Sequence, residues 1–355
     1  MPIIWPLWPY FRALPMETPE RGYTQAPVKP IPPRLTSPSR AFLQLFSPGG
    51  LHSRLSILIY HRVLSRQDPL FPDESEAEAF DRQIGHLAAC FRIIPLGDAV
   101  QCLGKGTLPP RAACITFDDG YADNAEIALP ILQKHGVSAT FFVATSFLDG
   151  GRMFNDTVIE LIRYAPGSTV DLDSLGLGRF EIETIPQRRQ AISHLLSKLK
   201  YLPPASRQSK VEAMCALIPV VPATNLMMTS DQVRILHAAG MEIGGHTASH
   251  PILAQMENSA ACADIATGKE MLEGIIRAPV RLFAYPNGKP GQDYLPDHVS
   301  MVKNLGFDAA VSTAHGAART GSDLFQLPRF TPWDREPVRF TLRMVQNLLR
   351  AVETV

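Results

Sequence analysis

The chain has 355 residues and a mass of 39.0 kDa, and its 34 Lys and Arg residues balance its 34 Asp and Glu residues. A hydrophobic fraction of 45% excludes wholesale disorder, and the length suggests two domains or one large α/β domain with insertions. Because the net charge is zero and no dense basic run occurs, we expect no nucleic acid as a partner.

The cysteines and the apolar segments narrow the class further. The 5 cysteines are odd in number and form no C-x-x-C pair, which favours free thiols over a disulfide framework or a cysteine-based zinc site. No stretch offers the ~20 mostly apolar residues of a membrane span, and the N-terminus lacks the features of a signal peptide. We therefore expect a cytoplasmic or membrane-peripheral protein.

In chain order, residues 1–50 are predicted to form a proline-rich tail and lead-in, followed by a main domain over 51–335. Within that domain, short apolar runs alternate with stretches of helical periodicity, which predicts a parallel sheet, either open or closed into a barrel. The expected strands are Leu55–Tyr60, Ala113–Phe117, Ala139–Ala144, Met241–Gly244, Arg281–Ala284 and Phe307–Val311. The expected helices are Phe80–Cys90, Ala122–His135, Asn155–Tyr164, Asp231–Ala239, Ala260–Ile276 and Asp297–Leu305.

Two segments depart from this alternation. Residues 165–230 are mostly helical in pattern and too long for an ordinary connection, so we interpret them as an insertion that caps the substrate face or mediates assembly. Residues 336–355 contain an amphipathic pattern over Glu336–Thr354, which predicts a C-terminal helix on the outside of the domain.

Ligands of parallel α/β folds bind at the carboxyl ends of the strands, and the first candidate there is an acidic pair. Asp118 and Asp119 follow an apolar run and precede Gly120, which permits a turn. Two adjacent carboxylates repel each other, so they favour either a metal or a division of acid and base roles. An ordinary Asp-Asp-Gly turn is the alternative.

A histidine pair follows another predicted strand, directly after Gly244 and Gly245. His246 and His250 are four residues apart, which would place both imidazoles on one face of a helical turn, at a spacing suited to metal chelation. Pro251 disfavours helix at His250 and therefore predicts a short, compact turn.

Two further strand ends carry polar or aromatic groups. The segment Phe283–Gly288 contains Tyr285 and Pro286 and is suited to walling a pocket, although a plain strand-to-turn corner has the same composition. His61 follows the first apolar run, where a lone histidine can equally be structural. Two histidines and an aspartate form a three-ligand set with an open position, which is typical of a catalytic zinc site, and such a metal lowers the pKa of its water towards ~7. The second aspartate could then serve as general base and a further histidine as general acid.

These motifs resemble a known family. Thr116–Gly120, read with His246–His250, resembles the polysaccharide deacetylases of carbohydrate esterase family 4, the NodB-homology group, over roughly residues 55–330. The resemblance implies a deformed (β/α) barrel of parallel strands, here with a helical insertion. It also implies metal-dependent removal of acetyl groups from N-acetylated sugars of a glycan, the work of a hydrolase acting on carbon–nitrogen bonds other than peptide bonds.

The resemblance also implies roles for individual residues. Asp118 matches the catalytic base, and Asp119, His246 and His250 match the metal ligands. The metal would be zinc, with cobalt, nickel or manganese as alternatives, because such a donor set does not select strongly among them. The backbone N–H of Tyr121 would stabilise the oxyanion.

Other parts of the family pattern are altered in this chain. Tyr285 and Pro286 resemble the motif that walls the substrate groove, with Asn287 at a position where aromatic residues are common, and Arg281 is an imperfect match for the arginine that supports the base. The usual late Leu-x-His motif with the general acid is absent.

The stretch Tyr60–Val63 resembles a permuted subgroup in which an early Tyr-His supplies the acid, and many of its members process exopolysaccharide. His61 is therefore our candidate for the general acid. The alternatives are a catalytically weak glycan-binding relative and a metal hydrolase of another amide or ester.

Overall fold

The structure is a computed structural model that describes residues 38–331, 334 and 336–355, all within one compact unit, Thr36–Val355. Most of the predicted N-terminal tail therefore lies outside the described residues. The lead-in contains a helix, α1 (Pro38–Phe46), and the turn η1 (Gly50–His52). None of the helices in the described part of the chain is long and apolar enough to cross a membrane.

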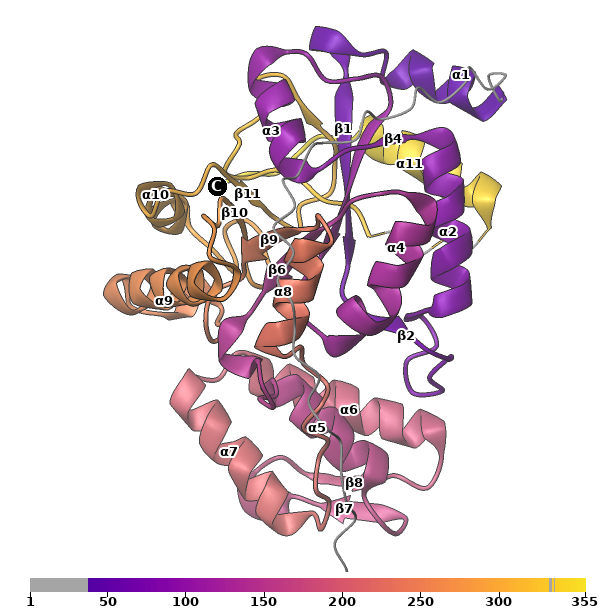
Figure 1. The fold of residues 1–355 in the computed structure, drawn as a ribbon. Coiled ribbons are helices and arrows are strands. Elements are labelled where there is room, and N and C mark those ends of the chain that lie inside the picture. The colour runs from indigo at the N-terminus through magenta and orange to yellow at the C-terminus, as the bar shows by residue number, and fades with distance from the viewer. Residues whose placement is uncertain (1–37, 332–333, 335) are drawn as a thin grey trace, which may run out of the picture. The chain divides into compact units, whose positions relative to one another are not determined.

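The centre of the molecule is a curled sheet of mostly parallel strands surrounded by helices (Figure 1). Its strands run in the order β11–β10–β9–β6–β5–β1–β12, and β12 alone is antiparallel to its neighbour. The bounds are β1 (Arg54–Tyr60), β4 (Arg92–Ile93, beside the start of β5), β5 (Ala112–Phe117), β6 (Thr140–Val143), β9 (Glu242–Gly245), β10 (Leu282–Ala284), β11 (Ala309–Val311) and β12 (Ala318–Arg319). The predicted strands are confirmed within one or two residues at each end, and the parallel, barrel-like fold is confirmed with them.

The segment 324–330 runs between β11 and β1 and pairs with both. Leu327 pairs with Val311 of β11, and Phe330 pairs with Leu58 of β1, each through a parallel bridge. The backbone of Phe330 donates to the Ile57 carbonyl and accepts from the Ile59 N–H, at 2.8 and 3.0 Å. This closure, which the apolar patterning did not predict, delivers the side chain of Arg329 to the interior.

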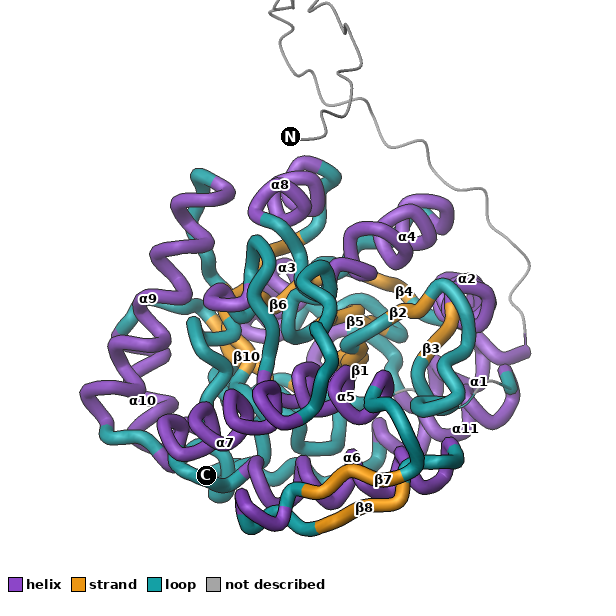
Figure 2. Tube along the Cα trace, turned by 90° about the horizontal axis from the view of Figure 1, so that it is seen from below, coloured by secondary structure: helices purple, strands orange, loops and turns teal. Residues whose placement is uncertain are grey.

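Helices cover the outside of the barrel (Figure 2). They are α2 (Ala77–Cys90), the π-helical turn η2 (Asn124–Ala128) leading into α4 (Leu129–His135), α8 (Ser230–Ala238), α9 (Asn258–Ile276), α10 (Pro296–Asn304) and α11 (Pro337–Leu348). The helices predicted in this layer are confirmed, except that the C-terminal helix ends at Leu348, earlier than its amphipathic pattern suggested. The 5 cysteines are free thiols, as expected.

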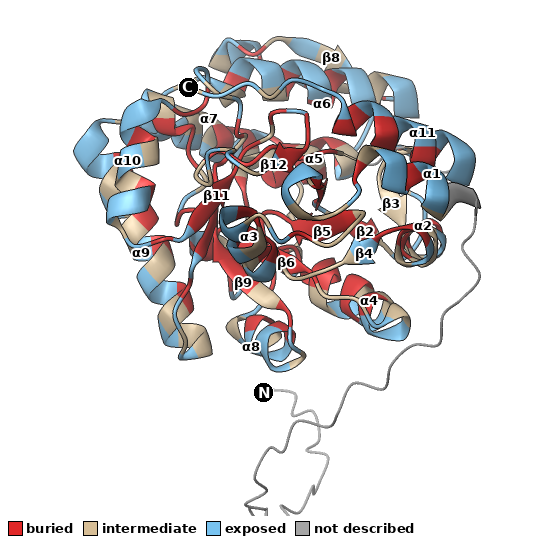
Figure 3. Ribbon diagram, turned by 90° about the horizontal axis from the view of Figure 1, so that it is seen from above, coloured by how far each residue is buried: buried red, intermediate tan, exposed pale blue. Residues whose placement is uncertain are grey.

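Alternate residues of β5 face two different parts of the core. Ile115 and Phe117 pack with the surrounding helices, whereas Cys114 packs with residues of β1, β10 and β11 inside the barrel. The same interior cluster includes Leu96 and Leu103 of α3 (Leu96–Lys105), a helix that the sequence did not predict. Viewed from above, α3 lies over the buried strands (Figure 3). Burial on both faces explains why these strands are continuously apolar.

The predicted insertion packs with α5 (Phe154–Tyr164) as a layer beside the carboxyl ends of the strands (Figure 1). It consists of the hairpin β7 (Thr169–Asp171) and β8 (Arg179–Glu181), the turn η4 (Asp173–Leu175), and two helices, α6 (Ile185–Lys200) and α7 (Pro204–Leu217). A capping box between Thr184 and Gln187 begins α6. Its own hydrophobic cluster unites α5, α6 and α7. Shorter elements elsewhere are β2 (Val63–Leu64), β3 (Ser75–Glu76), η3 (Thr145–Phe147) and η5 (Leu253–Gln255).

Candidate active site

The acidic pair lies at the carboxyl end of β5, where the strand turns sharply. Asp119 and Gly120 have positive φ angles of 76° and 89°. A Cβ on Gly120 would lie 2.9 Å from the side chain of Val143, so both the conformation and the space favour glycine. The turn points the carboxylates of Asp118 and Asp119 into one buried site, as the sequence predicted.

The two histidines lie on an irregular loop after β9. The prediction that they share a face of a helical turn is wrong, because Thr247 and His250 have left-handed φ angles of 66° and 50°. The Thr247 hydroxyl accepts a hydrogen bond from the His250 N–H at 3.0 Å, which closes the loop. The carboxylate of Asp264 accepts from the Ala248 N–H at 2.9 Å and so ties the same loop to α9.

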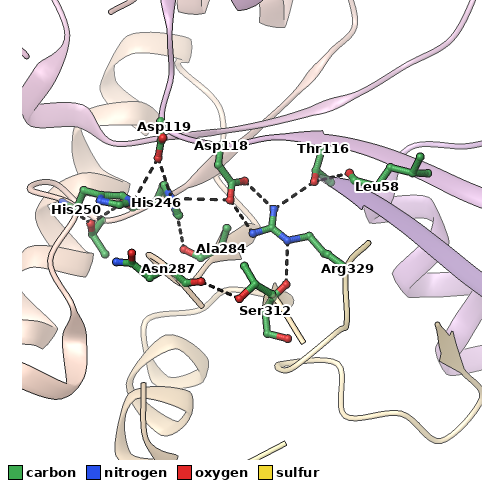
Figure 4. Close-up of polar contacts among 12 residues, drawn as sticks. Leu58, Thr116, Asp118, Asp119, His246, His250, Ala284, Asn287, Ser312 and Arg329 are labelled. Carbon is green, nitrogen blue, oxygen red and sulfur yellow. Dashed lines mark hydrogen bonds and ion pairs between the residues drawn. The ribbon is translucent and has the colours of Figure 1, made fainter. Parts of the chain in front are cut away.

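Asp119, His246 and His250 converge into one cluster whose ligand atoms all lie within 4.8 Å of one another (Figure 4). Asp119 Oδ1 lies 3.4 Å from His246 Nε2 and 3.3 Å from His250 Nε2. That oxygen is buried and has no hydrogen-bond partner among the described residues. An unsatisfied carboxylate oxygen facing two imidazole nitrogens fits a divalent cation, because these are the donor atoms that such an ion takes.

The protonation states also fit a metal. His246 Nδ1 lies 2.7 Å from the Ala284 carbonyl oxygen; this contact favours a proton on Nδ1 and leaves Nε2 directed towards Asp119. Burial lowers the pKa of His250 to about 4, so its imidazole is neutral at pH 7. Burial alone would raise the pKa of Asp119, but His250 and His246 lower it well below its usual value.

Asp118 is held by Arg329 in a fully buried, two-pronged ion pair (Figure 4). Both Arg329 Nη atoms donate to the carboxylate at 2.6 Å, and Arg329 Nε donates to the Ser312 carbonyl at 3.0 Å. Burial would raise the pKa of Asp118, but Arg329 and His246 together lower it, so the carboxylate is ionised and fixed in position. His246 Nε2 lies 4.0 Å from Asp118 Oδ2.

Arg329 corrects the expectation for Arg281. The side chain of Arg281 is 59% exposed and lies 3.8 Å from Asp308, where it cannot support the base. Sequence reasoning missed Arg329 because it considered only polar residues that directly follow strands. The one available signal was an arginine inside the apolar run Leu327–Phe330, where an unpaired charge would be costly.

These groups open into a cavity of about 380 Å³ between the strand ends and α5. His61 is exposed and lines this cavity, near enough to lower the pKa values of Asp118 and Asp119. Tyr121 also lines it, but its hydroxyl is directed towards Asp156 of α5, 3.1 Å away.

Asp156 is a buried carboxyl that sequence reasoning did not identify. It is 4% exposed, and burial together with the charge of Asp119 raises its pKa to about 7. The guanidinium of Arg62 lies 4.7 Å from the centre of the Tyr121 ring and partly offsets this effect. The cavity is therefore lined on α5 by a carboxyl group that takes up or releases a proton near neutral pH.

The expected groove-wall residues lie elsewhere. Tyr285 is fully buried, stacks on Tyr294 at 4.0 Å between ring centroids, and donates to the Phe325 carbonyl at 3.0 Å. Pro286 is buried as well, and neither residue lines the cavity. Asn287 lines it instead, with a positive φ of 60°. The prediction of substrate contact for Tyr285 and Pro286 is therefore wrong, because the strand directs that ring into the core.

Comparison with known proteins finds a family that part of this chain matches. The sequence model of the family "Polysaccharide deacetylase" matches residues 105–165 and 199–310, and the unmatched part between them lies within the insertion. YxkH of Bacillus subtilis, named as a candidate polysaccharide deacetylase, is 32% identical over 91 residues, which are 26% of this chain and 32% of that protein. The match thus spans about a third of the relative's length.

Solved structures share the fold. The deacetylase PplD of Streptococcus pyogenes, solved with acetate, has a TM-score of 0.54 at 18% identity, over 83% of this chain and 98% of the other. IcaB of Ammonifex degensii has a TM-score of 0.52 at 18% identity, over the same shares. The predicted resemblance is confirmed in part of the sequence and in the fold.

Proposed function

The chain resembles the polysaccharide deacetylases in sequence and in fold, and from that premise we propose that it is a metal-dependent hydrolase that removes acetyl groups from N-acetylated sugars of a glycan. One observation carries the proposal. Three potential metal ligands lie together beside the carboxylate of Asp118, which forms a buried ion pair with Arg329. All three ligands and Asp118 line the cavity.

Asp119, His246 and His250 would hold the metal, and zinc suits a donor set of two imidazoles and one carboxylate. When bound, the metal would polarise the acetyl carbonyl and make hydroxide available at neutral pH. The proposed general base, oxyanion donor and general acid are groups of the chain itself.

Asp118 takes the role of general base. Its carboxylate is ionised and cannot rotate while Arg329 holds both of its oxygens, so it can receive the proton of the attacking water. The N–H of Tyr121 is the proposed donor to the oxyanion. The Tyr121–Met227 bridge is formed through the Gly120 carbonyl and the Ala122 N–H, so it does not engage the Tyr121 N–H.

His61 is the proposed general acid. It lines the cavity and is exposed, so it can exchange its proton with solvent between turnovers. As the carbon–nitrogen bond breaks, the imidazolium protonates the leaving nitrogen, and the products are acetate and a sugar amine. Without this proton an amine leaves poorly.

The test is acetate release from an N-acetylglucosamine oligomer. The wild type should release acetate, lose the activity in a chelator and recover it with added zinc. Asp118→Asn should be inactive, whereas Asp98→Asn, the same change at an exposed position on α3, should remain active. A protein that binds the oligomer without releasing acetate would instead be a glycan-binding relative. Release from small esters alone would indicate a different hydrolase.

A further inference from the structure

A second cavity of about 200 Å³ adjoins the main one and extends it towards the insertion. The two share the lining residues Asn155, His250 and Asn287. The residues that line the second cavity but not the main one include Lys200 at the end of α6 and Arg207 in the first turns of α7. A glycan with its acetyl group beside His250 could therefore place a neighbouring sugar unit against these two cations.

Within the described part of the chain, both cations lack a carboxylate partner. Neither Lys200 nor Arg207 forms an ion pair with any of the residues that the structure describes. Arg207 Nη1 donates to the Lys200 carbonyl at 3.2 Å, and its guanidinium lies 4.4 Å from the centre of the Phe154 ring. Burial lowers the pKa of Arg207, with no neighbouring carboxylate offsetting the effect.

The arginines that line the main cavity differ from Arg207 in that each forms an ion pair with a carboxylate. Arg163 is paired with Asp68 at 2.6 Å, and Arg62 with Asp123 at 2.8 Å. A partly buried guanidinium normally has such a partner, because removing its charge from water is costly. Arg207 has no carboxylate partner among the residues that the structure describes, which leaves its guanidinium able to bind the anion of a ligand.

We propose that Lys200 and Arg207 form a subsite for an anionic group, a carboxylate or a phosphate, on the sugar unit next to the one that is deacetylated. The proposal rests on the proposed function, since it names the class of glycan that the same cleft binds. Arginine and lysine donors match both kinds of anion, and the carboxylates of Asp118 and Asp119 disfavour an anion on the reacting unit itself.

Arg207 also has a structural role, which must be distinguished from its proposed role in binding an anion. Its bond to the Lys200 carbonyl caps the last turn of α6, and a basic residue at a helix C-terminus is favourable in itself. That bond uses one of its five N–H donors, so the rest can serve a ligand.

The experiment compares the binding of three tetrasaccharides to the full chain by calorimetry, with acetate followed in the same samples. The first is a neutral tetramer of N-acetylglucosamine. The second alternates N-acetylglucosamine with glucuronic acid, and the third is an N-acetylglucosamine tetramer that carries phosphate groups. A double variant, Lys200→Gln with Arg207→Gln, is compared with a control double variant, Lys198→Gln with Lys210→Gln. This control removes two charges from the same helices, at lysines bonded to the Leu177 and Leu175 carbonyls.

We expect the wild type and the control to bind an acidic tetrasaccharide about tenfold more tightly than the neutral one, with a preference that falls as salt is added. The Lys200 and Arg207 variant should bind all three alike. Comparing the affinities for the two acidic tetrasaccharides shows whether the subsite prefers a carboxylate or a phosphate.

Equal binding of acidic and neutral glycans by the wild type, or a preference that survives in the variant, would overturn the subsite. If the variant does not fold, an acidic preference of the wild type that is insensitive to salt would overturn it as well. Acidic binding without acetate release from any glycan would leave the subsite standing and refute the proposed function. Acetate release without a preference for the acidic glycans would support the proposed function and refute the subsite.

Discussion

The two walls of the cleft differ in how their charged groups are paired. On the barrel wall, formed by the strand ends, Asp118 is bonded at both oxygens to Arg329, and Asp119 faces two imidazoles. On the insertion wall, formed by α5, α6 and α7, the pKa of Asp156 is raised to about 7. Lys200 and Arg207 on this wall form no ion pair with a carboxylate of the described residues.

We infer from this difference that the barrel wall carries out the reaction and the insertion wall selects the substrate. Asp118 and His246 on the barrel wall are buried and held by hydrogen bonds, as a reaction that depends on exact positions requires. Lys200 and Arg207 on the insertion wall form no ion pair with a described residue and suit recognition of a variable part of the substrate. The account therefore predicts that barrel-wall variants abolish turnover, whereas insertion-wall variants change stability, pH dependence or substrate preference.

The largest effect is expected for Asp118→Asn. Because an amide cannot accept the proton of the attacking water, kcat for acetate release should fall by about 10²–10⁴-fold. Metal content should be unchanged, since Asp118 is not in the ligand cluster. A variant that keeps its turnover would remove Asp118 from the chemistry and erase the distinction between the walls.

Arg329→Gln should affect both activity and folding. Removing one partner of a buried ion pair leaves a lone buried carboxylate, which costs about 3–5 kcal/mol of folding free energy. Urea denaturation measures this loss, and kcat should fall because Asp118 is no longer held. Arg329→Lys keeps the charge but not the two-pronged bond, so it should fold better while kcat stays reduced. A loss of stability with full kcat would make Arg329 purely structural.

His61→Ala tests the residue at the rim of the cavity. We expect kcat to fall by about 10²-fold or more, with the metal retained, because the leaving amine loses its proton donor. The control is His52→Ala, which removes another exposed imidazole, from the turn η1. Loss of the metal from the His61 variant would instead make His61 a ligand, and an unchanged kcat would end its role as acid.

Asp156→Asn should have the smallest effect on turnover, and it should act on stability instead. The pKa of Asp156 is raised to about 7, whereas the unfolded chain ionises near its ordinary value of 3.8. Between these two pH values the unfolded state is the one that loses its proton, so wild-type stability falls as pH rises. At about 1.4 kcal/mol for each pKa unit, the cost reaches an upper limit of about 4 kcal/mol above pH 7.

The asparagine variant has no carboxyl at this position to ionise, so its advantage over the wild type should grow from pH 4 to pH 7 and then level off. Urea denaturation of the metal-free proteins across that range measures it. A stability difference that does not change with pH would show that Asp156 titrates alike in both states.

Local patterns in the sequence predicted the barrel wall well. Apolar strands followed directly by Asp118, Asp119, His246 and His250 were recognisable because strand and side chain are adjacent in the chain. Arg329 was not, because it reaches Asp118 only through the closing segment 324–330, a long-range arrangement with no local signal. Tyr285 was misplaced for a related reason. Its motif predicted a loop at a strand end but not the direction of its ring, which packing against Tyr294 determines.

The insertion wall could be predicted only as helical. Periodicity indicated helices in residues 165–230, and α6 and α7 are present there. Which of their faces turns towards the cleft depends on packing against α5, and the sequence pattern alone did not specify it. Lys200 and Arg207 therefore emerge only from the three-dimensional structure.

The most direct test of the central claim is the metal content of Asp119→Ala, measured by elemental analysis after loading with zinc and removal of the excess. The account predicts about one equivalent of metal in the wild type and in Asp118→Asn, and almost none in Asp119→Ala. Full occupancy in a folded Asp119→Ala variant would contradict the claim that Asp119, His246 and His250 bind one ion together.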